Sequence, residues 1–118
     1  MFDIDFYRTE SGECPTEEYL DSLNKKLRAK TLRSISILEE FGNELRHPIS
    51  APLGDGIFEL RTITGSDITR ILYFFLVGEK IILTHGFTKK TQKTPLREIE
   101  RAKKYRQDYM KRICKGSV

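Results

Sequence analysis

The sequence lacks any apolar run long enough to cross a membrane as a helix, which needs about 20 residues. Its longest apolar run, residues 71–77, has only the length of a strand. The first residues, MFDID, are acidic where a signal peptide would be basic, and no apolar stretch follows them. These absences argue against a membrane protein and predict a cytoplasmic one.

Cysteine is scarce as well. The chain has two cysteines, Cys14 and Cys114, and neither belongs to a CxxC or Cys/His cluster, so structural zinc is not indicated. Reduced thiols are favoured in a cytoplasmic chain, although the count alone allows a long-loop disulfide. The sequence contains no P-loop, GxGxxG, HExxH or serine-nucleophile motif, and its acids form no obvious metal cage. We therefore expect neither a metal nor a cofactor.

The chain has 118 residues, which predicts a single domain over residues 1–118 with one core. Its net charge of +4 is unevenly distributed. Residues 1–24 contain seven acids and one arginine, whereas residues 89–115 contain eleven lysines and arginines and three acids. This asymmetry indicates a basic face and a polyanionic partner. A solvated, lysine-rich helix would give the same composition.

Hydrophobic periodicity predicts a strand and a helical hairpin in the first third of the chain. Residues 2–7 alternate between apolar and polar side chains, as in a half-buried strand. Pro15 fits the first position of a short helix with Cys14 or Thr16 near its cap, and Asn24 separates this helix from a longer one. Gly42 and Pro48 are the expected terminators of the longer helix. Its expected apolar stripe consists of Leu32, Ile35, Leu38 and Phe41.

The rest of the chain predicts a loop, three strands and a last helix. Residues 49–56 are interpreted as the loop, and the strands are expected at 57–63, 68–77 and 80–87. Thr94 is the expected N-cap of the last helix. The buried stripe of that helix is expected to contain Ile99, Ala102, Tyr105, Tyr109 and Ile113. The order βααβββα predicts an α+β fold, an antiparallel twisted sheet with helices packed on one face.

Three charged residues are expected to meet on this sheet. Glu59 and Arg61 share one side of a strand, and Arg70 begins the neighbouring strand across a hairpin. Cross-strand neighbours lie within about 5 Å of each other, so the two guanidinium groups are expected to converge. Like charges held together need an anion between them. Glu59 would supply it in a structural role, and phosphate in a functional one.

The stretch from residue 84 to residue 95 is the most specific in the sequence. A strand ends near Phe87 and delivers Lys89, Lys90 and Lys93 into a polar loop before a helix N-terminus, a place suited to phosphate. Phe87 either stacks on a base or is the last core residue of its strand. For His85, inside the strand, a packing or hydrogen-bonding role is more common than catalysis.

Three segments of the chain together suggest a family. Residues 52–61 (PLGDGIFELR), 70–74 (RILYF) and 85–95 (HGFTKKTQKTP) resemble the phage-derived HigB-like branch of the RelE/ParE toxins. The resemblance extends over nearly the whole chain, and the last two motifs are specific for it in this order and spacing. It implies the same fold and the toxin half of a type II toxin–antitoxin pair, neutralised in a hetero-oligomer by a cognate helix-turn-helix antitoxin. The typical activity of this branch is ribosome-associated mRNA cleavage without metal, through the 2′-hydroxyl of the RNA.

The resemblance also assigns roles to residues. The expected catalytic set, which binds the scissile phosphate and stabilises the transition state, is Arg61, Arg70, Lys89 and Lys90. The expected RNA-binding set is Lys93, Phe87, Glu59 and His85. A lysine among the arginines is the expected general base or acid, but which one is left open. Sites of the RelE type often carry a C-terminal tyrosine, whereas this chain ends in CKGSV.

Two other functions are compatible with the same sequence. A ParE-like inhibitor of DNA gyrase would use the same fold without catalysis. A non-toxic phage accessory protein would retain only antitoxin or nucleic-acid binding. The clustered cations favour the nuclease, for which Arg70→Ala and Lys90→Ala are expected to abolish toxicity.

Overall fold

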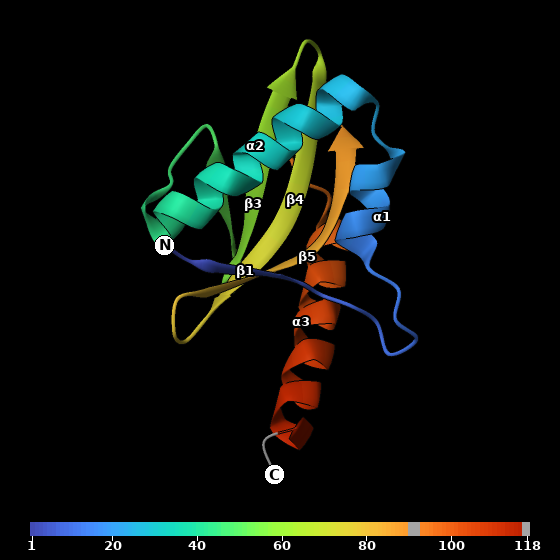
Figure 1. The fold of residues 1–118 in the computed structure, drawn as a ribbon, viewed down its shortest axis with the longest axis vertical. Coiled ribbons are helices and arrows are strands. Elements are labelled where there is room, and N and C mark those ends of the chain that lie inside the picture. Colours follow the sequence, from blue (N-terminus) through green and yellow to red (C-terminus); the bar gives the residue numbers. More distant parts are fainter. Residues whose placement is uncertain (90–92, 117–118) are drawn as a thin grey trace.

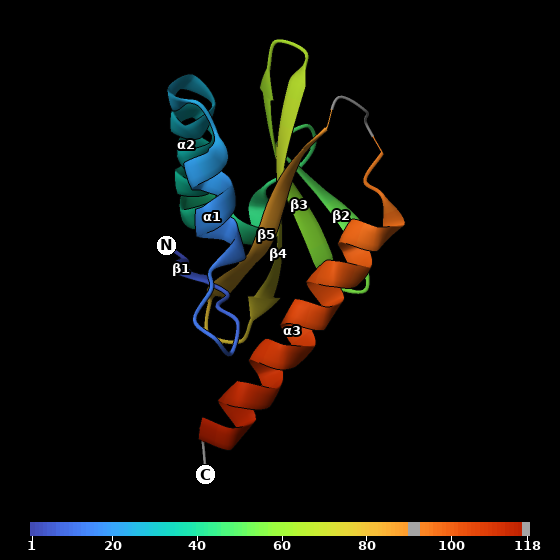
Figure 2. The ribbon, with the colours of Figure 1, turned by 90° about the vertical axis from the view of Figure 1, so that its right-hand side faces the viewer.

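The computed structural model describes residues 1–89 and 93–116 of the chain. Within these residues, a mixed five-stranded sheet lies between two layers of helices (Figures 1 and 2). The elements in chain order are β1 (Asp3–Phe6), α1 (Pro15–Ser22), α2 (Lys25–Phe41), the short 3-10 helix η1 (Gly42–Glu44), β2 (Ser50–Gly54), β3 (Ile57–Thr64), β4 (Asp67–Leu76), β5 (Lys80–Lys89) and α3 (Leu96–Gly116). The predicted α+β class is confirmed.

The sheet has the strand order β1-β5-β4-β3-β2. The strands from β2 to β5 form an antiparallel meander, of which the turns predict β3 to β5, whereas β1 pairs in parallel with β5. The sheet is therefore mixed, and the expectation of a purely antiparallel sheet is wrong. The connection between β1 and the meander contains α1 and α2 and carries the chain from one edge of the sheet to the other.

Residues 49–56 are not only a loop, because they contain strand β2. The prolines and glycines of this segment suggested a loop, but Pro52 pairs with Phe58 on a strand at the edge of the sheet. An edge position tolerates proline because a backbone N–H is not needed on the outer side. A register shift between Pro52 and Gly54 then ends the regular pairing.

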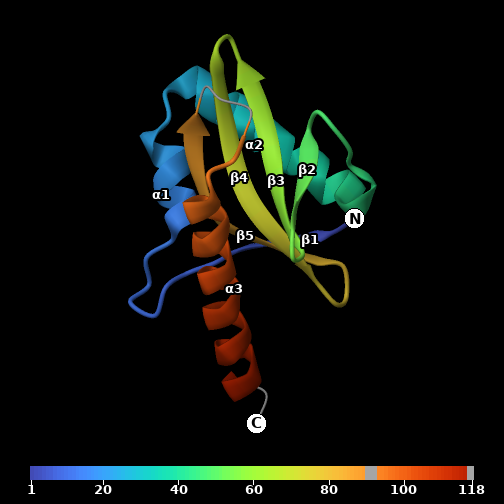
Figure 3. The same ribbon diagram turned by 180° about the vertical axis from the view of Figure 1, so that it is seen from behind.

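The helices cover both faces of the sheet, so the expected packing on one face is wrong (Figure 2). Leu20 of α1 and Leu38 of α2 pack on one face in the first core cluster. Ala102 of α3 packs on the other face, where Leu72 and Phe74 form a second cluster. Figure 3 shows α3 crossing this second face and continuing beyond the sheet. This layer was missed because the charged residues of β3 suggested an open face.

The helix boundaries follow the sequence closely. Cys14 is the N-cap of α1 with Pro15 as its first residue, and Asn24 caps α2 by accepting a hydrogen bond from the backbone N–H of Leu27 at 2.9 Å. Gly42 ends α2 with a φ of 51°. A glycine suits this position because a side chain there is strained.

Two of the predicted helix stripes are wrong in part. Leu32 and Phe41 are more than 40% exposed, and Ile113 of α3 is also exposed. Their places against the sheet are taken on α2 by small polar residues, Thr31 and Ser34. Both are hydrogen-bonded to threonines of the sheet, at 2.9 Å and 2.7 Å, so hydropathy alone could not identify them.

Candidate functional site

Glu59 is at the centre of a cluster of charges on the α3 face of the sheet. Arg61 and Arg70 are direct partners in the pairing of β3 with β4, as the hairpin predicts. Glu59 Oε2 accepts a hydrogen bond from Arg61 Nε at 2.6 Å, and Glu59 Oε1 lies 3.6 Å from Arg70 Nε. The carboxylate therefore joins the two arginines, which is the structural answer to their mutual repulsion.

The members of this cluster differ in depth. Glu59 and Arg70 have no exposed side-chain surface, whereas the Arg61 side chain is 15% exposed. Burial lowers the pKa of Arg70, and the charge of Glu59 opposes this shift. Arg61 is thus the arginine that reaches the surface. Arg70 lies beneath Arg61 in a supporting position, whereas the sequence predicts that Arg70 contacts the phosphate directly.

Thr94 ties the start of the last helix to the cluster. Its buried hydroxyl donates a hydrogen bond to Glu59 Oε1. The expected N-cap role of Thr94 is therefore wrong, since α3 begins at Leu96 and the backbone carbonyl of Pro95 accepts from its first turn. A threonine before Pro-Leu suggests a cap in sequence terms. The hydroxyl of Thr94 instead bonds to Glu59, which is 35 residues away in the chain.

Phe87 and His85 extend the cluster along β5. Arg70 lies over the Phe87 ring at 5.9 Å, a cation–π contact, and the rings of His85 and Phe87 stack at 6.2 Å. Phe87 is partly buried and packs against the second core cluster. The expected core role of Phe87 is confirmed, and its expected stacking on a base stays a prediction.

The structure describes two of the three predicted lysines, Lys89 and Lys93. Lys89 is the last residue of β5 and lies two residues beyond Phe87, so the alternation of a strand places it on the same face as Phe87 and Arg70. Lys93 is exposed and directly precedes Thr94. Lys90 lies outside the described residues. Arg61, Arg70 and Lys89 are therefore brought to one face of the sheet.

His85 is held by Glu98, a residue that the sequence analysis did not select. His85 Nε2 lies 3.0 Å from Glu98 Oε1, and His85 Nδ1 lies 3.2 Å from the hydroxyl of Thr84. The imidazole is 2% exposed, and burial lowers its pKa, against the opposing effect of Glu98. The hydrogen-bonding role expected for His85 is confirmed. Its partner was not evident from the sequence because Glu98 comes from the layer that α3 adds.

The lowered pKa of His85 predicts a pH-dependent stability. The unfolded chain binds a proton near pH 6.5, and the folded chain only at lower pH, so the unfolded state binds more protons below that value. The free energy of unfolding should be at its full value above pH 6.5 and fall as the pH decreases. The slope should reach at most about 1.4 kcal/mol for each pH unit.

Urea unfolding at pH 7.5, 6.0 and 5.0 measures this effect. His85→Gln keeps a side-chain N–H for Glu98 but does not titrate, so we expect a clearly smaller loss of stability in this variant. His47→Gln removes the other histidine, which is exposed, and should behave as the wild type does. Equal slopes in wild type and His85→Gln would contradict the burial of a neutral imidazole.

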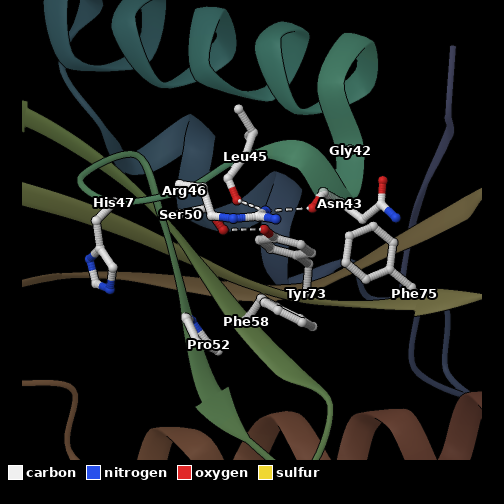
Figure 4. A pocket seen from close by; sticks show the side chains of 10 residues that line it. All are labelled: Gly42, Asn43, Leu45, Arg46, His47, Ser50, Pro52, Phe58, Tyr73 and Phe75. Carbon is white, nitrogen blue, oxygen red and sulfur yellow. Dashed lines mark hydrogen bonds between the residues drawn. The ribbon is translucent and has the colours of Figure 1, made fainter.

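A pocket on the opposite face of the sheet provides a contrast (Figure 4). It has a volume of about 220 Å³ and lies beside the end of α2. In this pocket the Tyr73 hydroxyl is 2.6 Å from Ser50 Oγ, and Arg46 donates to the backbone carbonyls of Asn43 and Leu45. The charged cluster does not line it. The pocket therefore does not coincide with the site that the sequence predicts.

Among residues 1–89 and 93–116, no group of three or more histidine, cysteine, aspartate or glutamate side chains is arranged to hold a metal ion. No helix among these residues has the length and apolar character needed to cross a membrane. Cys14 is buried, Cys114 is exposed, and these two described residues are not joined by a disulfide.

The comparison with protein families agrees with this architecture. The family model described as phage-derived protein Gp49-like (DUF891) matches residues 18–107, a segment that contains α2, the strands β2 to β5 and the charged cluster. No curated protein is similar enough to the chain to count as a match. The matched residues make up well over half of the sequence. The chain therefore belongs to the phage-derived Gp49-like family, which is part of the RelE/ParE/HigB toxin-like group.

Proposed function

We propose that this protein is the HigB-like toxin of a type II toxin–antitoxin pair and that it cleaves mRNA. The observation that carries this proposal is the position of Arg61. Its guanidinium reaches the surface from a buried carboxylate that is itself held by Arg70 and Thr94. An arginine fixed in this way is preorganised for a phosphate, because its orientation costs no further entropy when the ligand binds.

The reaction we propose uses the RNA's own nucleophile. The 2′-oxygen forms a bond to the adjacent phosphorus while the bond from phosphorus to the 5′-oxygen breaks, which gives a 2′,3′-cyclic phosphate and a 5′-hydroxyl. A general base accepts the proton of the 2′-hydroxyl, and a general acid donates one to the leaving 5′-oxygen. Arg61 stabilises the charge on the non-bridging oxygens, a contribution of roughly 3 kcal/mol in comparable sites.

The proposed proton carriers are Lys89 and Lys90. Lys89 shares the face of Arg61 and Arg70. Lys93 is adjacent in sequence to Thr94, which contacts Glu59, and is a proposed RNA-binding residue together with Phe87 and His85. The Arg70 guanidinium lies over the Phe87 ring, which stacks on His85.

The partners we propose are a cognate helix-turn-helix antitoxin and the translating ribosome. The basic segment that the sequence singles out is in large part the helix α3, which crosses the same face of the sheet as the charged cluster (Figure 3). Its exposed cations are Arg97, Arg101, Lys104, Lys111 and Arg112. Such a surface is suited to ribosomal RNA or to an acidic segment of a protein.

Induced expression in bacterial cells tests the proposed function. We expect growth arrest within minutes and new transcript ends in primer extension, while DNA gyrase remains active. Co-expression of the adjacent helix-turn-helix gene, where the genome carries one, should restore growth. Growth arrest with intact transcripts and an induced SOS response would instead identify a gyrase inhibitor and overturn the nuclease.

A further inference from the structure

A second pocket is lined by His85 and lies outside the cluster of Glu59, Arg61 and Arg70. It has a volume of about 370 Å³ and lies between α1, the segment after β1, β5 and α3. The pairing of β1 with β5 ends at Leu83, and the pocket begins just beyond it, at His85 and Gly86. The other residues that line it are Thr9, Glu13, Pro15, Glu18, Tyr19, Arg101 and Tyr105.

Two tyrosines are fixed in the walls of this pocket. The Tyr19 ring lies against Gly86 so closely that a Cβ at residue 86 would come within 2.3 Å of it, and its hydroxyl is 2.5 Å from Thr88 Oγ1. On the opposite side, Tyr105 stacks on Tyr7 with ring centroids 4.6 Å apart. These contacts fix both rings, so the pocket has rigid aromatic walls.

The charges around the pocket are of opposite sign on its two sides. Glu13 and Glu18 come from the acidic N-terminal segment, and Arg101 comes from the basic helix α3. Arg101 lies over the Tyr105 ring at 5.6 Å and donates from Nε to the Tyr105 hydroxyl at 3.0 Å. The Arg101 guanidinium is therefore held over the Tyr105 ring, and its Nη1 lies 4.0 Å from Glu98 Oε1.

Guanine carries the complementary set of groups. Its O6 and N7 atoms accept hydrogen bonds, as an arginine requires, and its N1–H and N2–H₂ groups donate, as a carboxylate requires. Adenine lacks O6 and carries a donor at that position, so it would face Arg101 with the wrong group. A volume of about 370 Å³ is sufficient for a purine with its ribose.

We propose that this pocket binds a guanine base, with Glu18 and Arg101 as its specificity-determining residues. The proposal rests on the proposed function for the source of the base, which is an RNA nucleotide close to the scissile phosphate. The guanidinium carbon of Arg70 lies 5.9 Å from the centroid of the Phe87 ring. The Phe87 centroid lies 6.2 Å from that of the His85 ring, and His85 lines the pocket. The toxin would thus prefer transcripts with a guanine at a fixed position from the cut.

Nucleotide binding to the isolated protein tests the pocket without any cleavage. In NMR titrations, GMP should shift the amide signals of His85 and Gly86 in a saturable way. AMP should bind to the wild type about tenfold more weakly than GMP does, and GMP should bind to Glu18→Gln about tenfold more weakly than to the wild type. IMP should be intermediate because it lacks the N2 amino group. Inorganic phosphate should leave these two signals unshifted. Glu17→Gln is the matched control, since Glu17 faces Arg8 and does not line the pocket.

Each outcome bears on one proposal at a time. Equal binding of GMP and AMP, unchanged GMP binding by Glu18→Gln, or GMP shifts confined to residues around Arg61 would overturn the guanine pocket. In mapped transcript ends, a guanine enriched at one position in wild type and lost in Glu18→Gln supports it for RNA. Specific GMP binding without RNA cleavage keeps the pocket and removes the nuclease, whereas cleavage without GMP selectivity does the reverse.

Discussion

Replacing Glu59 with glutamine is expected to lower the free energy of unfolding by about 3–5 kcal/mol. The reason is Arg70, whose side chain is fully buried and whose charge is balanced in the structure by Glu59. Glutamine keeps one oxygen, for Thr94 or for Arg61, places an NH₂ group at the other position and removes the negative charge. A buried guanidinium next to a neutral amide bears a large desolvation penalty, which is why breaking one side of such a pair costs more than the pair contributes.

Urea unfolding of Glu59→Gln and of a matched variant measures this cost. Glu40→Gln removes one carboxylate from the exposed side of α2 and should change stability by less than about 0.5 kcal/mol. The double variant Glu59→Leu with Arg70→Met replaces the buried charges by apolar groups and is expected to recover most of the loss. A Glu59→Gln protein as stable as the wild type would show that Arg70 is not buried as a charge.

The largest effect on activity is expected for Arg61→Ala. Under the proposed function, this change removes the guanidinium that stabilises the developing phosphorane charge, and the cleavage rate should fall about 10²–10³-fold. The fold should survive, since Glu59 keeps its contacts with Arg70 and Thr94. Arg61→Lys keeps the charge but loses the planar fork, so we expect an intermediate rate.

Single-turnover cleavage of one transcript in a translating extract gives these rates. Arg33→Ala, on the exposed side of α2, removes a cation from the opposite layer of the molecule and should cleave at the wild-type rate. Circular dichroism of each variant separates loss of chemistry from loss of fold. Wild-type cleavage by Arg61→Ala would remove this arginine from the proposed mechanism.

The meeting of Arg61 and Arg70 was predictable because it depends on local sequence. The turn material of residues 64–67 sets the register of β3 against β4, and this register alone places the two arginines opposite each other. Glu59 precedes Arg61 by two residues and therefore shares its face. The structure confirms this part of the cluster.

The contacts made by α3 were not predictable in the same way. Thr94 is hydrogen-bonded to Glu59, and Glu98 to His85, only because α3 crosses the second face of the sheet. Charged residues at Glu59 and Arg61 made that face look solvated in the sequence, whereas the helix buries it. No local pattern predicts such contacts, because they are made by tertiary packing. Thr94 is 35 residues from Glu59 in the chain, and Glu98 is 13 residues from His85.

In the proposed mechanism, Arg61 acts on a phosphate attacked by the neighbouring 2′-oxygen of the RNA. The most direct measurement places a single 2′-deoxy nucleotide at the main cleavage position of a transcript and follows its cleavage by the purified protein in a translating extract. This mechanism predicts that cutting stops at that position only, and that the unmodified transcript gives 2′,3′-cyclic phosphate and 5′-hydroxyl ends. Continued cutting at the deoxy position, or 5′-phosphate ends, would contradict it.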